Sequence, residues 1–135
     1  MILLSCDAAI EMADGSETGL MLRGLLCPNE MVVASDALQT QVAQRLAELV
    51  KQSRFNEKRA QKILWCVGEL TERHIPARKY AAEALNLALE RDVPATDALE
   101  VLMAKRLPAT LFTLDARLQA ACNELGVVCT HNATL

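Results

Sequence analysis

The stretch that decides the fold is Leu111-Phe112-Thr113-Leu114-Asp115-Ala116-Arg117-Leu118, near the C-terminal end of the 135-residue chain. The apolar run at 109–113 predicts a buried strand, and Asp115 follows it closely. Apolar residues then recur at the spacing of one helix face, up to Gly126, which stands where a left-handed helix C-cap is expected. Residues 127–129 predict a further strand. Strand, acidic residue, helix and strand in succession favour a parallel α/β sheet.

The rest of the chain repeats this alternation. Apolar runs predict strands at 2–6 and 31–34, and Pro76 favours a brief extended stretch at 74–77. Helical periodicity predicts helices over about 16–26, from 36 to about 51, 57–73, 81–92 and, capped by Thr96, 97–106. We expect one α/β domain, residues 1–135, in which helices cover both faces of a mainly parallel sheet.

Composition narrows the function classes. Apolar residues make up 52% of the chain and aromatic residues only 3%, which argues against recognition of nucleic acid by base stacking. The formal charge of −3 argues against a DNA-coating surface. The five cysteines include no C-x-x-C pair, so a zinc site is not indicated. Their odd number and the lack of a secretion signal predict reduced thiols, mostly buried, in a cytoplasmic protein with no membrane helix.

Three acidic residues stand where an open α/β sheet forms its sites, at the carboxyl ends of strands. Asp7 follows the first strand, Asp115 follows the strand at 109–113, and Asp97 opens a helix after a loop. Converging carboxylates suit a hard cation such as Mg²⁺. Each also has a local explanation, because Asp7 and Asp115 can cap helices and Asp97 can complement a helix dipole.

The motifs resemble those of the PIN domain family. The resemblance rests on Thr96-Asp97-Ala98-Leu99, on the stretch 111–118, on Glu124-Leu125-Gly126-Val127, and on the opening Leu3-Leu4-Ser5-Cys6-Asp7-Ala8. It spans nearly the whole chain. The resemblance implies a three-layer α/β/α domain with a central, mainly parallel sheet of four or five strands.

The resemblance also implies an activity. PIN domains are commonly Mg²⁺- or Mn²⁺-dependent endoribonucleases, and many small ones are the toxins of toxin–antitoxin pairs. Carried over by motif, Asp7, Asp97 and Asp115 become the catalytic, metal-binding acids, and Thr113 orients the surroundings of Asp115. RNA, a small antitoxin protein and a second copy of the chain are the implied partners.

The chain departs from the family pattern at two positions. Gln41 stands where the family usually has a metal-binding Glu, and Ala9 stands where a Ser or Asn is common. Both changes weaken metal binding, so the alternative is a catalytically inactive PIN-like module that binds RNA or a protein partner. Glu100, Glu11 or Asp36 could replace the missing acid, or could be ordinary surface acids.

Basic residues gather around the two central helices, and their side chains could contact phosphates or form an ordinary solvated face. Trp65 lies in an apolar run and is expected in the core or at a dimer interface. The basic residues are Arg45, Lys51, Arg54, Lys58, Arg59 and Lys62.

Overall fold

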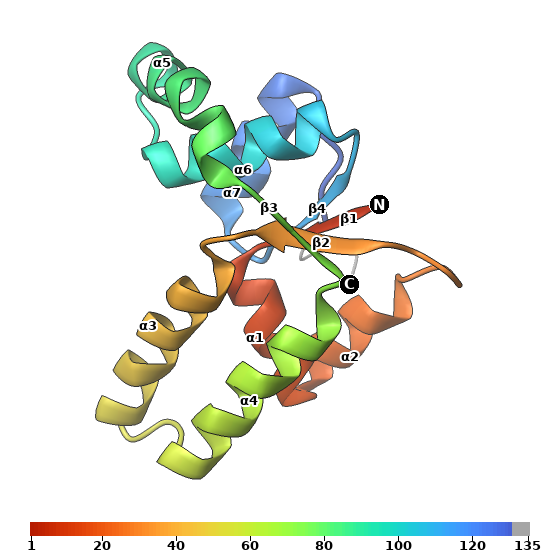
Figure 1. Ribbon diagram of the computed structural model, residues 1–135, viewed down its shortest axis with the longest axis vertical. Coiled ribbons are helices and arrows are strands. Elements are labelled where there is room, and N and C mark those ends of the chain that lie inside the picture. The colour runs from red at the N-terminus through yellow and green to blue at the C-terminus, as the bar shows by residue number, and fades with distance from the viewer. Residues whose placement is uncertain (131–135) are drawn as a thin grey trace.

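The computed structural model describes residues 1–130 and contains one four-stranded parallel sheet, in the order β3-β2-β1-β4. The strands are β1 (Ile2–Leu4), β2 (Val32–Ser35), β3 (Arg73–Ile75) and β4 (Thr110–Phe112). β1 pairs with both β2 and β4, so the first strand lies in the middle of the sheet. Figure 1 shows the sheet between two groups of helices, as expected for a three-layer α/β/α fold.

Alternation along β1 assigns the two faces of the sheet. Ile2 and Leu4 pack into one hydrophobic cluster, whereas Leu3 packs into the other. Because successive side chains of a strand point to opposite faces, a strand that is apolar at every position must be covered on both sides. All three residues of β1 are buried.

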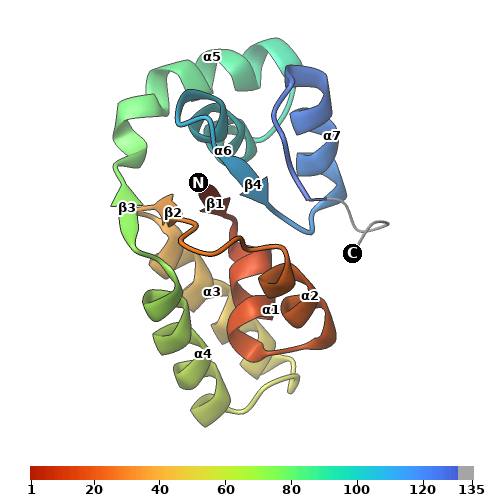
Figure 2. The same cartoon turned by 90° about the vertical axis from the view of Figure 1, so that its right-hand side faces the viewer.

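Four helices cover the face of Ile2 and Leu4, and three lie on the side of Leu3, where the last two of them pack against the sheet (Figure 2). The first group is α1 (Cys6–Asp14), α2 (Glu17–Gly24), α3 (Leu38–Lys51) and α4 (Glu57–Leu70). The second group is α5 (Ala81–Arg91), α6 (Ala95–Arg106) and α7 (Ala116–Leu125), preceded by the 3₁₀ turn η1 (Ala77–Tyr80). Among residues 1–130, no helix combines the length and apolar character needed to cross a bilayer.

Several local predictions were wrong. The chain forms a helix, α1, directly after β1, where none was expected; it is only nine residues long and Gly15, with φ 73°, ends it. Gly19 of α2 packs so closely on α1 that a Cβ there would lie 1.9 Å from the carbonyl oxygen of Glu11. The helix predicted over 16–26 is therefore the second half of a helix pair.

Three further corrections concern the second half of the chain. Thr96 does not cap α6, because the helix already begins at Ala95, after Pro94. The strand expected at 127–129 contributes only an isolated bridge between Cys129 and Leu111. The stretch around Ile75 is a strand as expected, but it starts at Arg73, because α4 ends at Leu70.

The exposure of Trp65 and of the cysteines can also be compared with the predictions from the sequence. Trp65 is 66% exposed, so of its two expected places the core is wrong and a dimer interface stays a prediction. The five cysteines are all free, and Cys122 and Cys129 are buried as expected of small apolar side chains. Cys27 is exposed, which the sequence did not predict.

Candidate functional site

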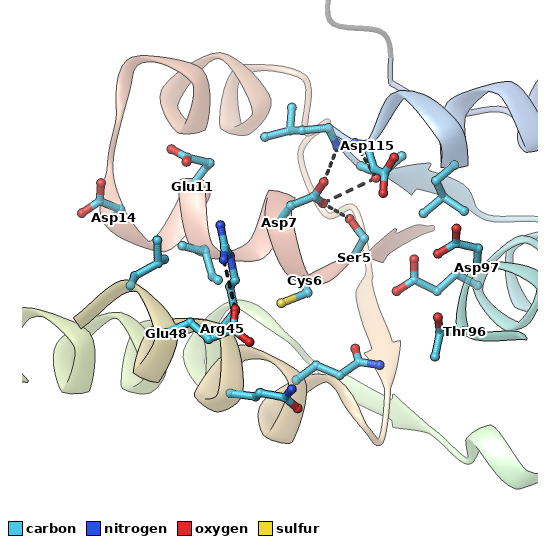
Figure 3. Close-up of a pocket in the computed structure, with 18 of the residues that line it drawn as sticks. Ser5, Cys6, Asp7, Glu11, Asp14, Arg45, Glu48, Thr96, Asp97 and Asp115 are labelled. Atoms are coloured by element: carbon cyan, nitrogen blue, oxygen red, sulfur yellow. Dashed lines mark hydrogen bonds and ion pairs between the residues drawn. The ribbon is translucent and has the colours of Figure 1, made fainter. Parts of the chain in front are cut away.

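A cavity of about 690 Å³ opens at the carboxyl ends of β1 and β4, between the two groups of helices. Its polar lining includes Ser5, Asp7, Glu11, Asp14, Gln41, Gln44, Arg45, Glu48, Arg54, Thr96, Asp97, Glu100, Thr113 and Asp115. Asp7, Asp97 and Asp115 therefore line one cavity, although they come from three separate parts of the chain. Figure 3 shows these three near one end and Asp14, Glu11, Arg45 and Glu48 toward the other.

The carboxylate of Asp7 accepts hydrogen bonds from residues that follow β1 and β4. Its Oδ1 accepts the backbone N–H of Ala8 at 2.7 Å and the hydroxyl of Ser5, and its Oδ2 accepts the N–H of Leu114 at 3.1 Å. The Ser5 hydroxyl also lies 2.8 Å from the carbonyl oxygen of Phe112. Because these donors are fixed by β1 and β4, the carboxylate of Asp7 has a defined orientation. Ser5 was not singled out in the sequence.

Asp97 and Glu100 lie three residues apart on α6, and both line the cavity. Burial first, and then the nearby carboxylates of Asp7, Asp97 and Asp115, raise the pKa of Glu100 to about 8. The pKa of Asp97 is raised above its ordinary value by burial first and by Asp115 second, with Arg117 acting in the opposite direction. This end of the cavity therefore concentrates negative charge with little compensation.

Asp115 caps α7, as one of the sequence-based alternatives proposed. Its Oδ1 accepts the N–H of Arg117 at 2.9 Å, and the guanidinium of Arg117 lies 3.8 Å from its other oxygen. The cap does not exclude a role in the cavity, since a carboxylate has further lone pairs.

Thr113 connects two of the acids. The N–H of Asp115 donates to the Thr113 hydroxyl at 3.1 Å, and that hydroxyl lies 3.5 Å from Oδ1 of Asp7. The side-chain amide of Gln119 in turn donates to the backbone carbonyl oxygens of Thr113 at 3.1 Å and of Thr130 at 2.7 Å. Gln119 is buried, and the sequence analysis did not predict that its side chain would support Thr113. A glutamine next to Leu118, one residue from the predicted apolar face, was the available signal.

We call Asp7, Asp97, Glu100 and Asp115 the inner acids, and Glu11, Asp14 and Glu48 the outer acids. Each outer acid has a partner. Ser16 donates to Glu11 at 2.5 Å, Arg59 to Asp14 at 2.5 and 2.8 Å, and Arg45 to Glu48 at 3.0 Å. The outer acids therefore belong to hydrogen bonds and ion pairs between helix residues.

The other candidate metal-binding residues differ in whether they line the cavity. Gln41 lines the cavity from α3, and Glu100 and Glu11 also line it. Asp36 does not; it is exposed and accepts the N–H of Ala77 at 3.1 Å. Ala9 is fully buried in the core and is not part of the cavity lining.

The donor chemistry of the inner acids fits a hard divalent cation, since all the ligating atoms are oxygens and the one ion pair that they form within residues 1–130 is that of Asp115 with Arg117. Within residues 1–130, however, no three His, Cys, Asp or Glu side chains already converge as a closed metal cluster. Metal binding would require the inner acids to rotate toward one another, and the hydrogen bonds of Asp7 and Asp115 oppose that movement.

Comparison with known proteins places the fold. No family model matches the chain, and no curated protein matches it either. The solved structures that resemble it include the following two. PAE2754 from Pyrobaculum aerophilum is 18% identical with a TM-score of 0.66, covering 88% of this chain and 82% of its own. FitAcB from Neisseria gonorrhoeae is 20% identical with a TM-score of 0.60, covering 100% of both chains. At this identity the likeness concerns the fold alone, and that fold is the three-layer α/β/α arrangement of the PIN-like type.

Proposed function

We propose that this protein is a Mg²⁺- or Mn²⁺-dependent endoribonuclease of the toxin type, with a weakened metal site. The observation that carries the proposal is the meeting of the four inner acids, from α1, α6 and the start of α7, in one cavity. Like charges at close quarters are unfavourable without a cation, and such clusters are typical of functional sites.

A bound divalent ion would supply the chemistry by lowering the pKa of a water molecule and by neutralising charge on the scissile phosphate. The chain's own residues would position it. Asp7 has a fixed orientation, and Asp97 and Glu100 project into the cavity from one helix. The family position usually occupied by Glu carries the neutral Gln41, so we assign the fourth negative charge to Glu100 instead.

Protonation of Glu100 gives this assignment a specific consequence. With a pKa of about 8, Glu100 holds its proton near neutral pH in the metal-free protein. A metal ligand must be ionised, so metal binding would release that proton and would tighten as the pH rises. The weak site proposed for the chain follows in part from this competition.

The experiment that tests the proposal is a calorimetric titration with Mn²⁺, combined with cleavage of a labelled single-stranded RNA. We expect weak Mn²⁺ binding, cleavage that EDTA abolishes, and loss of both in Asp97→Asn. Asparagine keeps the shape of the side chain, so a folded variant that still binds Mn²⁺ and cleaves would contradict the assignment.

The toxin part of the proposal rests on the motif resemblance, and it adds an antitoxin protein and a second copy of the chain as partners. RNA as the substrate has the same basis, whereas a cytoplasmic location is proposed from the odd number of cysteines and the lack of a secretion signal. Co-expression with the product of a neighbouring small reading frame, followed by co-purification, tests the antitoxin.

A second function has specific support. Gln41 removes a charge, and the inner acids do not form a ready-made metal cluster within the described chain. Both facts favour a catalytically inactive PIN-like module that binds RNA or a protein. RNA binding without Mn²⁺ binding or cleavage would decide for this alternative.

A further inference from the structure

We propose that the turn between α3 and α4 is the contact surface for the phosphate backbone of the nucleic acid, and that Arg54 is its principal residue. The inference rests on the proposed function, because it assigns the path of the substrate leaving the inner acids. It concerns the end of the cavity far from Asp97, where Figure 3 shows Arg45 and Glu48.

Charge distinguishes this turn from the rest of the molecule. Residues 51–62, which span the end of α3, the turn itself and the first part of α4, contain five basic residues and one acidic residue, while the whole chain has a formal charge of −3. The turn adjoins a cavity whose described lining contains seven carboxylates but only two basic residues, Arg45 and Arg54. A polyanion approaching the inner acids meets repulsion there, so a positive rim is where its flanking phosphates can bind.

Ion pairing singles out Arg54 among the arginines. The guanidinium of Arg45 is bound to Glu48 at 3.0 Å, and that of Arg59 is bound to Asp14 and lies 4.8 Å from the ring centre of Phe55. The side chain of Arg54 is exposed and makes no hydrogen bond or ion pair with residues 1–130. It is the one cavity-lining cation whose charge is not already compensated.

The backbone holds Arg54 in place. The N–H groups of Ser53 and Arg54 donate to the carbonyl oxygens of Val50 and Leu49, both at 2.9 Å, which is the hydrogen-bond pattern of a Schellman motif. Ser53 takes the left-handed conformation that this motif requires, with φ 59°. Because the turn is closed by its own hydrogen bonds, the position of Arg54 is largely fixed before any ligand arrives.

A second hollow extends the surface beyond the cavity. A neighbouring depression of about 510 Å³ is lined by residues of the same turn, including Ser53, Arg54, Asn56 and Arg59. Arg54 and Phe55 line both the depression and the cavity. A continuous track therefore runs from the inner acids past Arg54 onto the basic turn, which suits a single strand better than a separate acidic protein segment.

The test is binding of a labelled oligouridine by the full chain, measured by fluorescence anisotropy in EDTA from about 50 to about 200 mM KCl. We expect Arg54→Glu to weaken binding about tenfold and Arg54→Ala to lower the salt dependence by about 0.7, the value for one phosphate contact on a single strand. Arg54 is exposed and its side chain supports no contact in the described chain, so both variants should fold.

The matched control is Arg73→Glu. Arg73 is an exposed arginine at the amino end of β3, on the opposite edge of the sheet from the cavity. Equal weakening by Arg73→Glu and Arg54→Glu, no weakening by Arg54→Glu, or no binding by the unchanged protein would each overturn the inference. Competition by polyglutamate as effective as that by oligouridine would overturn the assignment to nucleic acid.

A cleavage assay in Mn²⁺ distinguishes failure of the nuclease proposal from failure of the proposed contact surface. Arg54-dependent binding without cleavage leaves the contact surface standing and removes the nuclease. Cleavage that Arg54→Glu and Arg73→Glu leave equally intact keeps the nuclease and removes this surface.

Discussion

Both ends of the cavity are lined by acidic side chains, but the groups that surround these side chains differ between the two ends. The outer acids each have a donor or a cation, so their charges are compensated by Ser16, Arg59 and Arg45. The inner acids lie among one another, and burial together with mutual repulsion raises the pKa values of Asp97 and Glu100. A carboxylate in a cavity is therefore not in itself a sign of function; the missing counter-charge is.

The hydrogen bonds of the inner acids refine this contrast. Asp7 and Asp115 accept backbone N–H groups, whereas no hydrogen bond within residues 1–130 is found for the side chains of Asp97 and Glu100. The two acids on α6 thus carry most of the unfavourable charge. Three variants, each with a control, test whether the two ends of the cavity differ in activity, stability and metal binding.

The largest effect is expected from removing an inner charge without disturbing the fold. Asp115→Asn keeps an N-cap residue for α7, since asparagine caps helices as well as aspartate does. We expect RNA cleavage to fall about 100-fold or more, because one metal-binding carboxylate is lost. Single-turnover cleavage in Mn²⁺ is the measurement.

Glu48→Gln is the control from the outer end, where the side chain is about half exposed. Its cleavage rate should change less than about threefold, because a solvated surface pair contributes little. Comparable losses in the two variants would show that the ends of the cavity do not differ in function.

An intermediate effect is expected in the pH dependence of stability. The folded-state pKa of Glu100, about 8, lies above its ordinary value of 4.5, so the folded chain keeps a proton that the unfolded chain releases. The stability contributed by Glu100 is therefore complete below about pH 4.5 and is lost as the pH rises to about 8. In EDTA at pH 8.5, Glu100→Gln should be more stable than the unchanged protein by about 1–2 kcal/mol, after allowance for partial exposure of the side chain.

Urea unfolding at pH 4.5 and pH 8.5 measures this difference, which should nearly vanish at the lower pH. Glu90→Gln, an exposed position on α5, is the control and should be neutral at both. A Glu100→Gln variant that is no more stable at pH 8.5 than at pH 4.5, relative to the unchanged protein, would mean that Glu100 is well solvated.

The smallest effect is expected from adding a charge. Gln41→Glu introduces the acid that is usual at this position in the PIN domains whose motifs the chain resembles, and a further carboxylate should tighten Mn²⁺ binding by about three- to tenfold. Calorimetry is the measurement. Gln44→Glu is the matched control, since Gln44 lines the same cavity from one turn further along α3 but is exposed. If both variants bind Mn²⁺ equally, position 41 has no special relation to the inner acids.

Much of the fold could be predicted because its signals are local. The apolar runs at β1, β2 and β4 identified strands, and periodicity identified α3, α4, α5 and α7. The failures have local causes as well. α1 is only nine residues long, and although Asp7, Glu11 and Asp14 recur along it at helical spacing, so short a period was not recognised as a helix. Val127 and Val128 looked like a strand, yet that segment forms only an isolated bridge, between Cys129 and Leu111.

The candidate site could be predicted only in outline. The motifs pointed to Asp7, Asp97 and Asp115, and Glu100 was named as one of several substitutes. Nothing in the local sequence distinguishes Glu100 from Glu11 or Asp36, since Glu100 and Glu11 each follow a candidate site acid by one helical turn and Asp36 lies close to the expected edge of the sheet. The structure separates them, because Glu11 has a serine partner and Asp36 caps a turn at the surface.

The sequence by itself determined most of the alternation of strands and helices, although not α1, together with the burial of the sheet on both faces and the placement of acids at strand ends. These follow from periodicity and from the short-range preferences of residues for strands, helices and caps. Only the tertiary structure decided which acids are compensated. The partner of Asp14 is Arg59, 45 residues away, and the neighbours of Glu100 come from α1 and the start of α7. Charge interactions depend on distance in space and on exclusion of water, and neither can be read from positions along the chain.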